Sequence, residues 1–386
     1  MAQGNSRSNT KDALRSNING ASKNSIIMDK MRRFINVHVP LSNCTLRCHY
    51  CYVTIHQTFG HPIPKTERSP EFIRKALSKE RLGGCCHLNF CADGETLLLP
   101  GLIDIFEQLL LEGHFISVVS NCTLNNRINE LIALPENLRK HLFVKASYHY
   151  LELKRLNLLD SFFENVQKLH KAGISLTIEI TPNDELIPFV DEAVEFCRKK
   201  MGAAPHFTVA RDEHFDHLPI LTSLPRDEYR RVWGKYDSVM FDFKEKIFGH
   251  PIKKFCYAGD WFLCLDLLSG NISQCHGTPS FQNIYSDLNE PIHNNPIGCH
   301  CPEAHCYNGH ALLTQGVVPA EESPTYAETR DRLMTNGEHW LYPEIQSFFS
   351  QRLYDNNPQH PWYKKFYINH KKTLRPIKKF FRIRWQ

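Results

Sequence analysis

Six short apolar runs alternate with helical patterns along the first half of the chain. β-branched and aromatic residues dominate most of these runs, as buried parallel strands require. The predicted strands are 34–40, 87–92, 115–120, 142–147, 174–180 and 206–210, and the predicted helices are 69–81, 98–112, 126–133, 159–172 and 184–200. Strands that alternate with helices predict an α/β fold whose parallel sheet is closed or nearly closed. Six repeats predict a partial (β/α)6 barrel.

The alternation stops after about residue 215. Residues 225–247 have a helical pattern, whereas 256–310 is rich in Cys, Gly, Pro, His and Asn and predicts short strands and loops. That segment has too little apolar content for a core of its own, so we expect another element to stabilise it. Helices return from 323. The predicted parts are a flexible lead-in (1–30), the barrel (31–220), a cysteine-rich extension (221–320) and a helical carboxy-terminal region with a basic tail (321–386).

Charge and composition restrict the class of protein. The 386 residues carry a net charge of +5, but nine Lys or Arg and no acid lie in 356–386, which leaves −4 for the rest. This body lacks the broad basic face of a nucleic-acid binder. No apolar run is long enough to cross a bilayer and no secretory signal is present, so we expect a cytoplasmic protein with reduced cysteines. The basic and aromatic segment 370–386 predicts either peripheral contact with the inner face of the membrane or a solvated terminus.

Three cysteines lie close together after the first predicted strand. Cys44, Cys48 and Cys51 have the spacing C-x3-C-x2-C. A structural zinc site needs four ligands, and His49 would have to turn back sharply to supply the fourth. A thioredoxin-like motif would use only Cys48 and Cys51 and leave Cys44 idle. A [4Fe–4S] cluster held by three thiolates instead leaves one iron open for a further ligand.

This spacing, with Tyr50 before the last cysteine, resembles the radical S-adenosylmethionine (radical SAM) enzymes over roughly residues 34–310. The resemblance implies a [4Fe–4S] cluster on Cys44, Cys48 and Cys51 whose open iron chelates SAM. Reductive cleavage of SAM would then give a 5′-deoxyadenosyl radical that abstracts hydrogen from the substrate. A flavodoxin or ferredoxin would supply the electron.

Further motifs resemble the SAM-binding loops of this family. The segment 91–98 (CADGETLL) is similar to the glycine-glycine-glutamate turn, with Asp93 at the first glycine. The segment 120–125 (SNCTLN) is similar to the loop near the ribose, with Cys122 at the glycine, although its first two residues also suit an ordinary turn. Arg211 suits the SAM carboxylate or a salt bridge at the barrel rim. The resemblance implies SAM contacts for Tyr50, Asp93, Gly94, Glu95, Ser120, Asn121, Ser147, Arg155 and Arg211.

A second set of cysteines follows the barrel. Cys256, Gly270 and Cys275 form a C-x13-G-x4-C pattern that resembles the opening of SPASM or twitch extensions, and the sequence between them predicts a β-hairpin. The resemblance implies one auxiliary [4Fe–4S] cluster. Its predicted ligands are Cys256, Cys275, Cys306 and either Cys299 or Cys301, while Cys264 either packs in the core or replaces one of them. A zinc ribbon is the alternative.

The sequence therefore predicts a radical SAM oxidoreductase whose substrate is a carbohydrate or another small molecule. The roughly 43 residues before Cys44 are too few for the leader-peptide module of many peptide-modifying members. Dehydrogenation and epimerisation are the expected outcomes. One alternative is a maturase that epimerises or cross-links a peptide or protein. A further alternative is a non-catalytic iron–sulfur or zinc protein.

Overall fold

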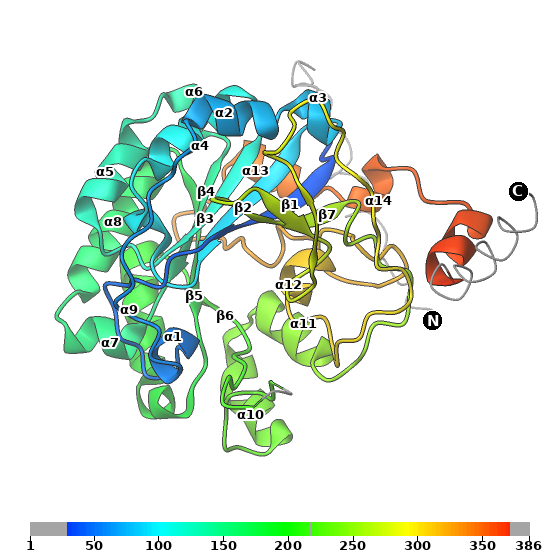
Figure 1. Cartoon of the computed structure of the whole chain (residues 1–386). Helices are drawn as coiled ribbons and strands as arrows, with labels where there is room; N and C mark the ends of the chain where they lie inside the picture. The colour runs from blue at the N-terminus through cyan, green and yellow to red at the C-terminus, as the bar shows by residue number, and fades with distance from the viewer. Residues whose placement is uncertain (1–28, 216–217, 371–386) are drawn as a thin grey trace, which may run out of the picture.

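The computed structural model describes residues 29–215 and 218–370, and it contains the predicted partial barrel (Figure 1). Six strands run parallel in the order β6-β5-β4-β3-β2-β1, so neighbours in the chain are neighbours in the sheet. They are β1 (Arg33–Val39), β2 (Cys86–Ala92), β3 (Phe115–Ser120), β4 (Leu142–Ser147), β5 (Ser175–Ile180) and β6 (His206–Phe207). The strand periodicity thus placed five strands to within a residue or two, whereas β6 ends well before the predicted residue 210.

The cysteine-rich extension continues the same sheet. Strand β7 (Phe262–Asp266) pairs in parallel with β1, and β8 (Asn271–Ser273) and β9 (Ser280–Asn283) follow in antiparallel order. The predicted hairpin is confirmed. Because β7 occupies the edge beside β1, the extension is joined to the barrel by backbone hydrogen bonds as well as by side-chain packing.

Helices connect the strands and follow them, and several of those between β2 and β6 cover the outer face of the barrel (Figure 1). They are α1 (Tyr52–Ile55), α2 (Pro70–Ala76), α3 (Lys79–Leu82), α4 (Leu102–Leu111), α5 (Asn125–Ala133), α6 (Glu136–Arg139), α7 (Tyr150–Arg155), α8 (Leu159–Lys171) and α9 (Val190–Met201), followed by α10 (Arg226–Trp233), α11 (Val239–Ile247), α12 (Gly309–Leu312), α13 (Pro343–Phe349) and α14 (Leu353–Asn356). Residues 362–370 are also helical.

Three predicted helices were too long, and each has a local cause. The helix predicted at 98–112 begins only at Leu102, because Gly101 adopts φ +74° at its amino-terminal cap. The segment 69–81 contains two helices, because the Ser78 side chain accepts a hydrogen bond from Arg81 N and starts a new turn. Residues 184–189, which contain Pro188, form a 3-10 helix before α9.

A second apolar cluster closes the barrel at the amino-terminal ends of its strands. Phe348 of α13 stacks on Phe115 of β3 at 3.7 Å, and the same cluster includes Phe34 of β1. Trp261, just before β7, stacks on Tyr257 at 3.6 Å within this cluster. The extension therefore gains its core by sharing one with the barrel, and the carboxyl ends of the strands remain for a site.

Two sequence predictions lie outside the described residues, namely the flexible lead-in up to residue 28 and the tail from 371 to 386. The division of the chain into four parts also stays a prediction. Within residues 29–215 and 218–370, no helix is both long and apolar enough to cross a membrane.

Candidate active site

The three cysteines of the loop after β1 face one cavity. Cys51 N donates to Cys48 O (3.1 Å), and Ile55 N donates to Cys51 O (2.9 Å), so a tight turn leads directly into α1. Cys44, Cys48 and Cys51 line a cavity of about 210 Å³ together with residues at the carboxyl ends of β2, β3 and β4. We call this the cysteine cavity.

The electrostatics of these thiols suit a bound cation. Burial raises the pKa of Cys48, and the neighbouring Cys51 and Cys44 thiolates raise it further. Three thiolates at this place therefore need positive charge nearby, which the irons of a cluster would supply. His49 Nε2 lies 2.8 Å from Glu185 Oε2 and is not among the lining residues of the cysteine cavity. Within the described chain, no three Cys, His, Asp or Glu side chains meet closely enough to hold a single metal ion.

Gly94 brings the loop after β2 against the cysteine loop. Gly94 N donates to Leu41 O and Glu95 N donates to Asn43 O, both at 2.8 Å. A Cβ atom on Gly94 would lie 2.1 Å from Asn43 O, so no other residue fits this contact without a shift of backbone. Asp93 stands where the family motif has a glycine. Its side chain is accommodated, and its carboxylate accepts a hydrogen bond from the Tyr52 hydroxyl (3.0 Å).

Glu95 joins this loop to the loop after β3. Its buried carboxylate accepts from Ser120 Oγ (2.8 Å), Asn121 N (2.7 Å) and Leu97 N (3.1 Å). Burial raises the pKa of Glu95, while the bond from Asn121 N opposes that rise. In this structure Glu95 thus positions two neighbouring residues of the predicted SAM site.

The loop after β3 reaches the first cysteine. Asn121 Nδ2 lies 3.6 Å from Cys44 Sγ and donates to Thr45 Oγ1 at 2.9 Å. Cys122 adopts φ +53°, so the left-handed conformation that a glycine would favour is retained by a cysteine. Asn121 therefore does more than form a turn, since its side chain holds the cysteine loop.

The other predicted SAM contacts lie either at the cysteine cavity or beside Glu152. Ser147 lines the cysteine cavity, and the Tyr50 hydroxyl lies 2.6 Å from Nδ1 of His149, which lines it too. Arg155 is engaged with Glu152 through two bonds of 2.8 Å, and Glu152 also accepts from Arg47 N (2.8 Å). Arg155 thus reaches the cysteine loop through Glu152.

Comparison with known proteins assigns this arrangement to a family. Residues 39–184 match the model of the radical SAM superfamily. Residues 39–184 thus form a radical SAM domain. The match extends from the end of β1 past β5 and so includes the cysteine loop and the loops after β2, β3 and β4. Membership implies a [4Fe–4S] cluster and SAM, and the three thiols at one cavity fit such a cluster.

A search of solved structures found weak similarity to several proteins, among them the following three. Streptococcus suis SuiB bound to S-adenosylmethionine is 13% identical over 68% of this chain and 67% of its own, with a TM-score of 0.46. Native anSMEcpe with bound AdoMet is 15% identical (66% and 79% covered, TM-score 0.44), and BtrN in an open conformation is 15% identical (68% and 79%, TM-score 0.30). No curated protein matched the sequence.

A larger cavity of about 710 Å³ adjoins the cysteine cavity of the radical SAM core. We call it the main cavity. Both cavities share lining residues, which are Tyr52, Cys91, Ala92, Asp93 and Val119. Arg211, predicted near the SAM carboxylate, lines the main cavity and lies 3.4 Å from Glu213.

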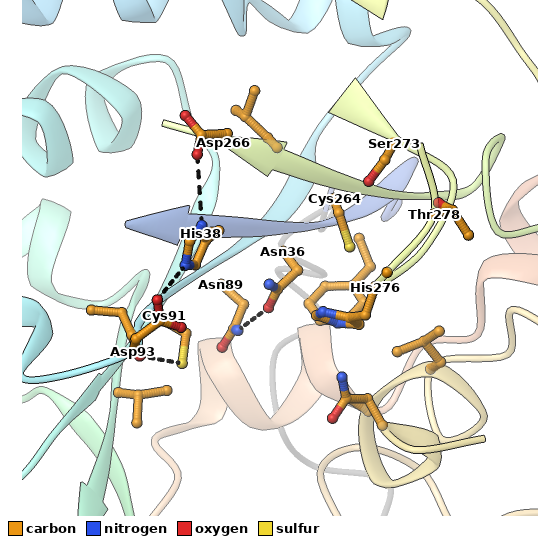
Figure 2. Close-up of a pocket in the computed structure, with 18 of the residues that line it drawn as sticks. Asn36, His38, Asn89, Cys91, Asp93, Cys264, Asp266, Ser273, His276 and Thr278 are labelled. Atoms are coloured by element: carbon orange, nitrogen blue, oxygen red, sulfur yellow. Dashed lines mark hydrogen bonds and ion pairs between the residues drawn. The ribbon is translucent and has the colours of Figure 1, made fainter. Parts of the chain in front are cut away.

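A histidine between two carboxylates links the barrel to the extension at this cavity. His38 Nε2 lies 3.3 Å from Asp93 Oδ2, and His38 Nδ1 lies 3.6 Å from Asp266 Oδ2 (Figure 2). Hydrogen bonds to Asp266 and Asp93 raise the pKa of His38 to about 9, so the ring is an imidazolium at neutral pH. Asp266 lies on β7, so this contact requires the extension.

Four thiols of the extension gather beside the hairpin. Burial raises the pKa of Cys306, and the Cys275, Cys256 and Cys301 thiolates raise it further, which places all four near one another. Cys299 instead contacts Asn369, whose Nδ2 lies 3.3 Å from its Sγ.

Cys264 on β7 lines the main cavity, as Figure 2 shows, although the Cys275 thiolate still adds to the rise that burial causes in its pKa. Cys301 is thus among the thiols that influence Cys306, whereas Cys299 contacts Asn369.

Sequence reasoning missed several polar residues of the main cavity. His38 and Asn36 on β1, Asn89 on β2 and Lys145 on β4 all line it. The sequence did contain a signal for them. Polar residues recur at every second position of strands that are otherwise apolar, as Asn36 and His38 do on β1. In a barrel packed with side chains these inward positions would be apolar, so polar ones indicate an interior cavity.

Proposed function

We propose that this radical SAM enzyme removes hydrogen from a small polar molecule bound in the main cavity. Cys44, Cys48 and Cys51 would hold the catalytic [4Fe–4S] cluster. When bound, the reduced cluster supplies the electron that cleaves SAM, and the resulting 5′-deoxyadenosyl radical removes a hydrogen atom from a C–H bond of the substrate.

The observation that carries this proposal is the shared wall of the two cavities. Cys91, Asp93 and Tyr52 line both of them, so a molecule in the main cavity lies next to the thiols that would hold the cluster. A radical formed at the cysteine cavity would meet the substrate without crossing solvent, which protects a reactive intermediate.

Around the cysteine cavity, the chain itself supplies orientation. Gly94 and Glu95 keep the loop after β2 against the cysteine loop, and Asn121 holds that loop through Thr45. These contacts fix the positions of the thiols relative to the carboxyl ends of the strands. Reacting groups held in this way lose less freedom in the reaction itself.

The size and chemistry of the main cavity support a small-molecule substrate. A cavity of about 710 Å³ is within the roughly 300–1,000 Å³ that small ligands occupy. Amide and hydroxyl side chains line it, among them Asn36, Asn89, Asn271, Ser273, Thr278, Ser280 and Asn308. Such groups exchange hydrogen bonds with hydroxyl or amino groups, as a carbohydrate or aminocyclitol would require.

We further propose one auxiliary [4Fe–4S] cluster on Cys256, Cys275, Cys301 and Cys306. The mutual effect of these thiols on the pKa of Cys306 supports this set. Four ligands would fill the cluster and leave no iron open, so its chemistry would be electron transfer.

Anaerobic reconstitution with iron, sulfide, SAM and dithionite tests the proposed function. We expect 5′-deoxyadenosine to form and, with a deuterated panel of sugars and aminocyclitols, deuterium to appear in it for one compound. Zinc in place of iron together with no 5′-deoxyadenosine would overturn the radical mechanism. Deuterium transfer from peptides alone would overturn the small-molecule substrate.

A further inference from the structure

A group of basic side chains converges on one part of the main cavity. Lys145 on β4, Arg211 after β6 and His310 on α12 line the cavity. Lys244 on α11 and Arg330 before α13 are buried nearby. Burial lowers the pKa of His310 far below its usual value, and Lys244, Arg330, Lys145 and Arg211 lower it further, so all four cations lie near this ring. We call these five residues the basic wall.

Carboxylates compensate only part of this charge. Arg330 forms an ion pair with Glu179, and Arg211 lies 3.4 Å from Glu213. Among the described residues, the ammonium group of Lys145 has no hydrogen-bond or ion-pair partner, although its backbone pairs within the sheet.

Lys244 Nζ donates to Thr208 Oγ1 (2.9 Å) but has no carboxylate within ion-pair distance in the described chain. Burial lowers the pKa of Lys244 to about 7, and the charge of Arg211 is the next largest cause. Two lysines at this wall thus lack a counter-ion.

Buried donors without partners point in the same direction. Arg330 is fully buried, yet its Nε and Nη2 atoms have no hydrogen-bond partner in the structure. The Nδ1 atom of His310 is likewise buried and unpartnered. Each such group destabilises the folded protein unless something satisfies it. Negative charge in the cavity would offset the excess of positive charge, and a ligand there could also pair with the ring of His310, which lines the cavity.

We propose that the basic wall binds a phosphate or carboxylate group of the substrate. This inference rests on the proposed function, since it takes the main cavity as the substrate site. It narrows the substrate to an anionic small molecule, such as a phosphorylated or acidic sugar. Lys145 and Arg211 would contact the anion directly, whereas Lys244 and Arg330 would act through the field at the cavity.

Calorimetric titration of the anaerobic holoenzyme with inorganic phosphate, and separately with acetate, tests the proposal at constant ionic strength and saturating SAM. We expect one of the two anions to bind, and Lys145→Met to weaken that binding by roughly 10- to 100-fold because a charged donor is lost. Lys145→Arg keeps the charge and should retain affinity within a few-fold. The control is Lys235→Met, because Lys235 is already paired with Asp191 (3.1 Å) and should change nothing.

Lys244→Met is a second variant of the same wall. The thermal midpoint and the iron content of each variant verify that it is folded. Acetate is ionised throughout pH 6–8, so a proton taken up by Lys244 or His310 on binding would make its affinity rise as the pH falls. The titrations are repeated without SAM. Anion binding that is seen without SAM but lost at saturating SAM would overturn the proposal, since the wall would then hold the cofactor carboxylate. No binding of either anion in an enzyme that forms 5′-deoxyadenosine would refute the basic wall alone. Binding without 5′-deoxyadenosine would refute only the radical function.

Discussion

The two groups of cysteines are built in opposite ways. Cys44, Cys48 and Cys51 lie on one loop, where local spacing alone brings them together at the cysteine cavity. The four thiols of the extension are spread from Cys256 to Cys306, and their mutual influence depends on tertiary packing, since β7 and α12 share one apolar cluster. The first group has three thiols and an adjoining cavity, which suits chemistry. The second has four, which suits a closed cluster.

The largest expected effect separates the two groups directly. Replacing Cys44, Cys48 and Cys51 by Ala should remove about four irons and abolish SAM cleavage, because the catalytic cluster loses all its protein ligands. Iron analysis and the 5′-deoxyadenosine assay measure this outcome. The control is Cys197→Ala, since Cys197 is fully buried in the core. Full iron content in the triple variant would contradict the assignment.

Replacing Cys275, Cys301 and Cys306 by Ala should also remove about four irons, yet SAM cleavage should continue while substrate turnover is lost. The single variants sharpen the comparison. Cys301→Ala should disturb the auxiliary cluster, whereas Cys299→Ala should keep the iron content of the native enzyme, because Cys299 contacts Asn369. Native iron content in Cys301→Ala and loss of iron in Cys299→Ala would make Cys299 the fourth ligand instead of Cys301.

A backbone contact beside the first group gives a smaller effect. Gly94→Ala should cost about 3 kcal/mol and weaken SAM binding, because the new Cβ atom would lie 2.1 Å from Asn43 O. Gly234 is a suitable control, since the nearest atom to its Cβ would be 3.8 Å away. Thermal unfolding and SAM titration measure both variants. Equal thermal stability of Gly94→Ala and Gly234→Ala would show that the loop after β2 can shift to accept a side chain at position 94.

The smallest expected effect concerns the link between barrel and extension. Because Asp266 and Asp93 raise the pKa of His38 to about 9, the folded enzyme holds this proton more tightly than the unfolded chain. The resulting stability is complete below pH 6.5 and is lost as the pH rises to 9. The His38 side chain is 40% exposed, so solvent screening reduces the contribution to about 1 kcal/mol.

The thermal midpoint of the SAM-free enzyme should therefore fall by about 2 °C more between pH 6.5 and 9 than that of His38→Gln. The charge of His38 also contributes to lowering the pKa of His276, but burial already keeps His276 neutral in this range. A parallel decline in both proteins would mean that the contact with Asp93 and Asp266 adds no stability.

Much of the fold could be predicted from the sequence, because strand and helix periods are local properties. The six parallel strands and the hairpin were predicted, and errors arose where local signals competed. Gly101 shortened one helix and Ser78 divided another. The shared core beneath the barrel was not predicted, since Phe115 and Phe348 meet across most of the chain.

The same distinction holds for the site. The sequence by itself determined the cysteine loop, because its three ligands lie within eight residues and short spacing restricts their geometry. Only the tertiary structure placed Cys299 against Asn369 and Asp266 against His38, and gathered Lys145, Lys244 and Arg330 near His310. These residues are far apart in the chain, and each alone is an ordinary polar side chain. Their chemistry depends on distances that the packing of the sheet and its helices sets, which no local pattern records.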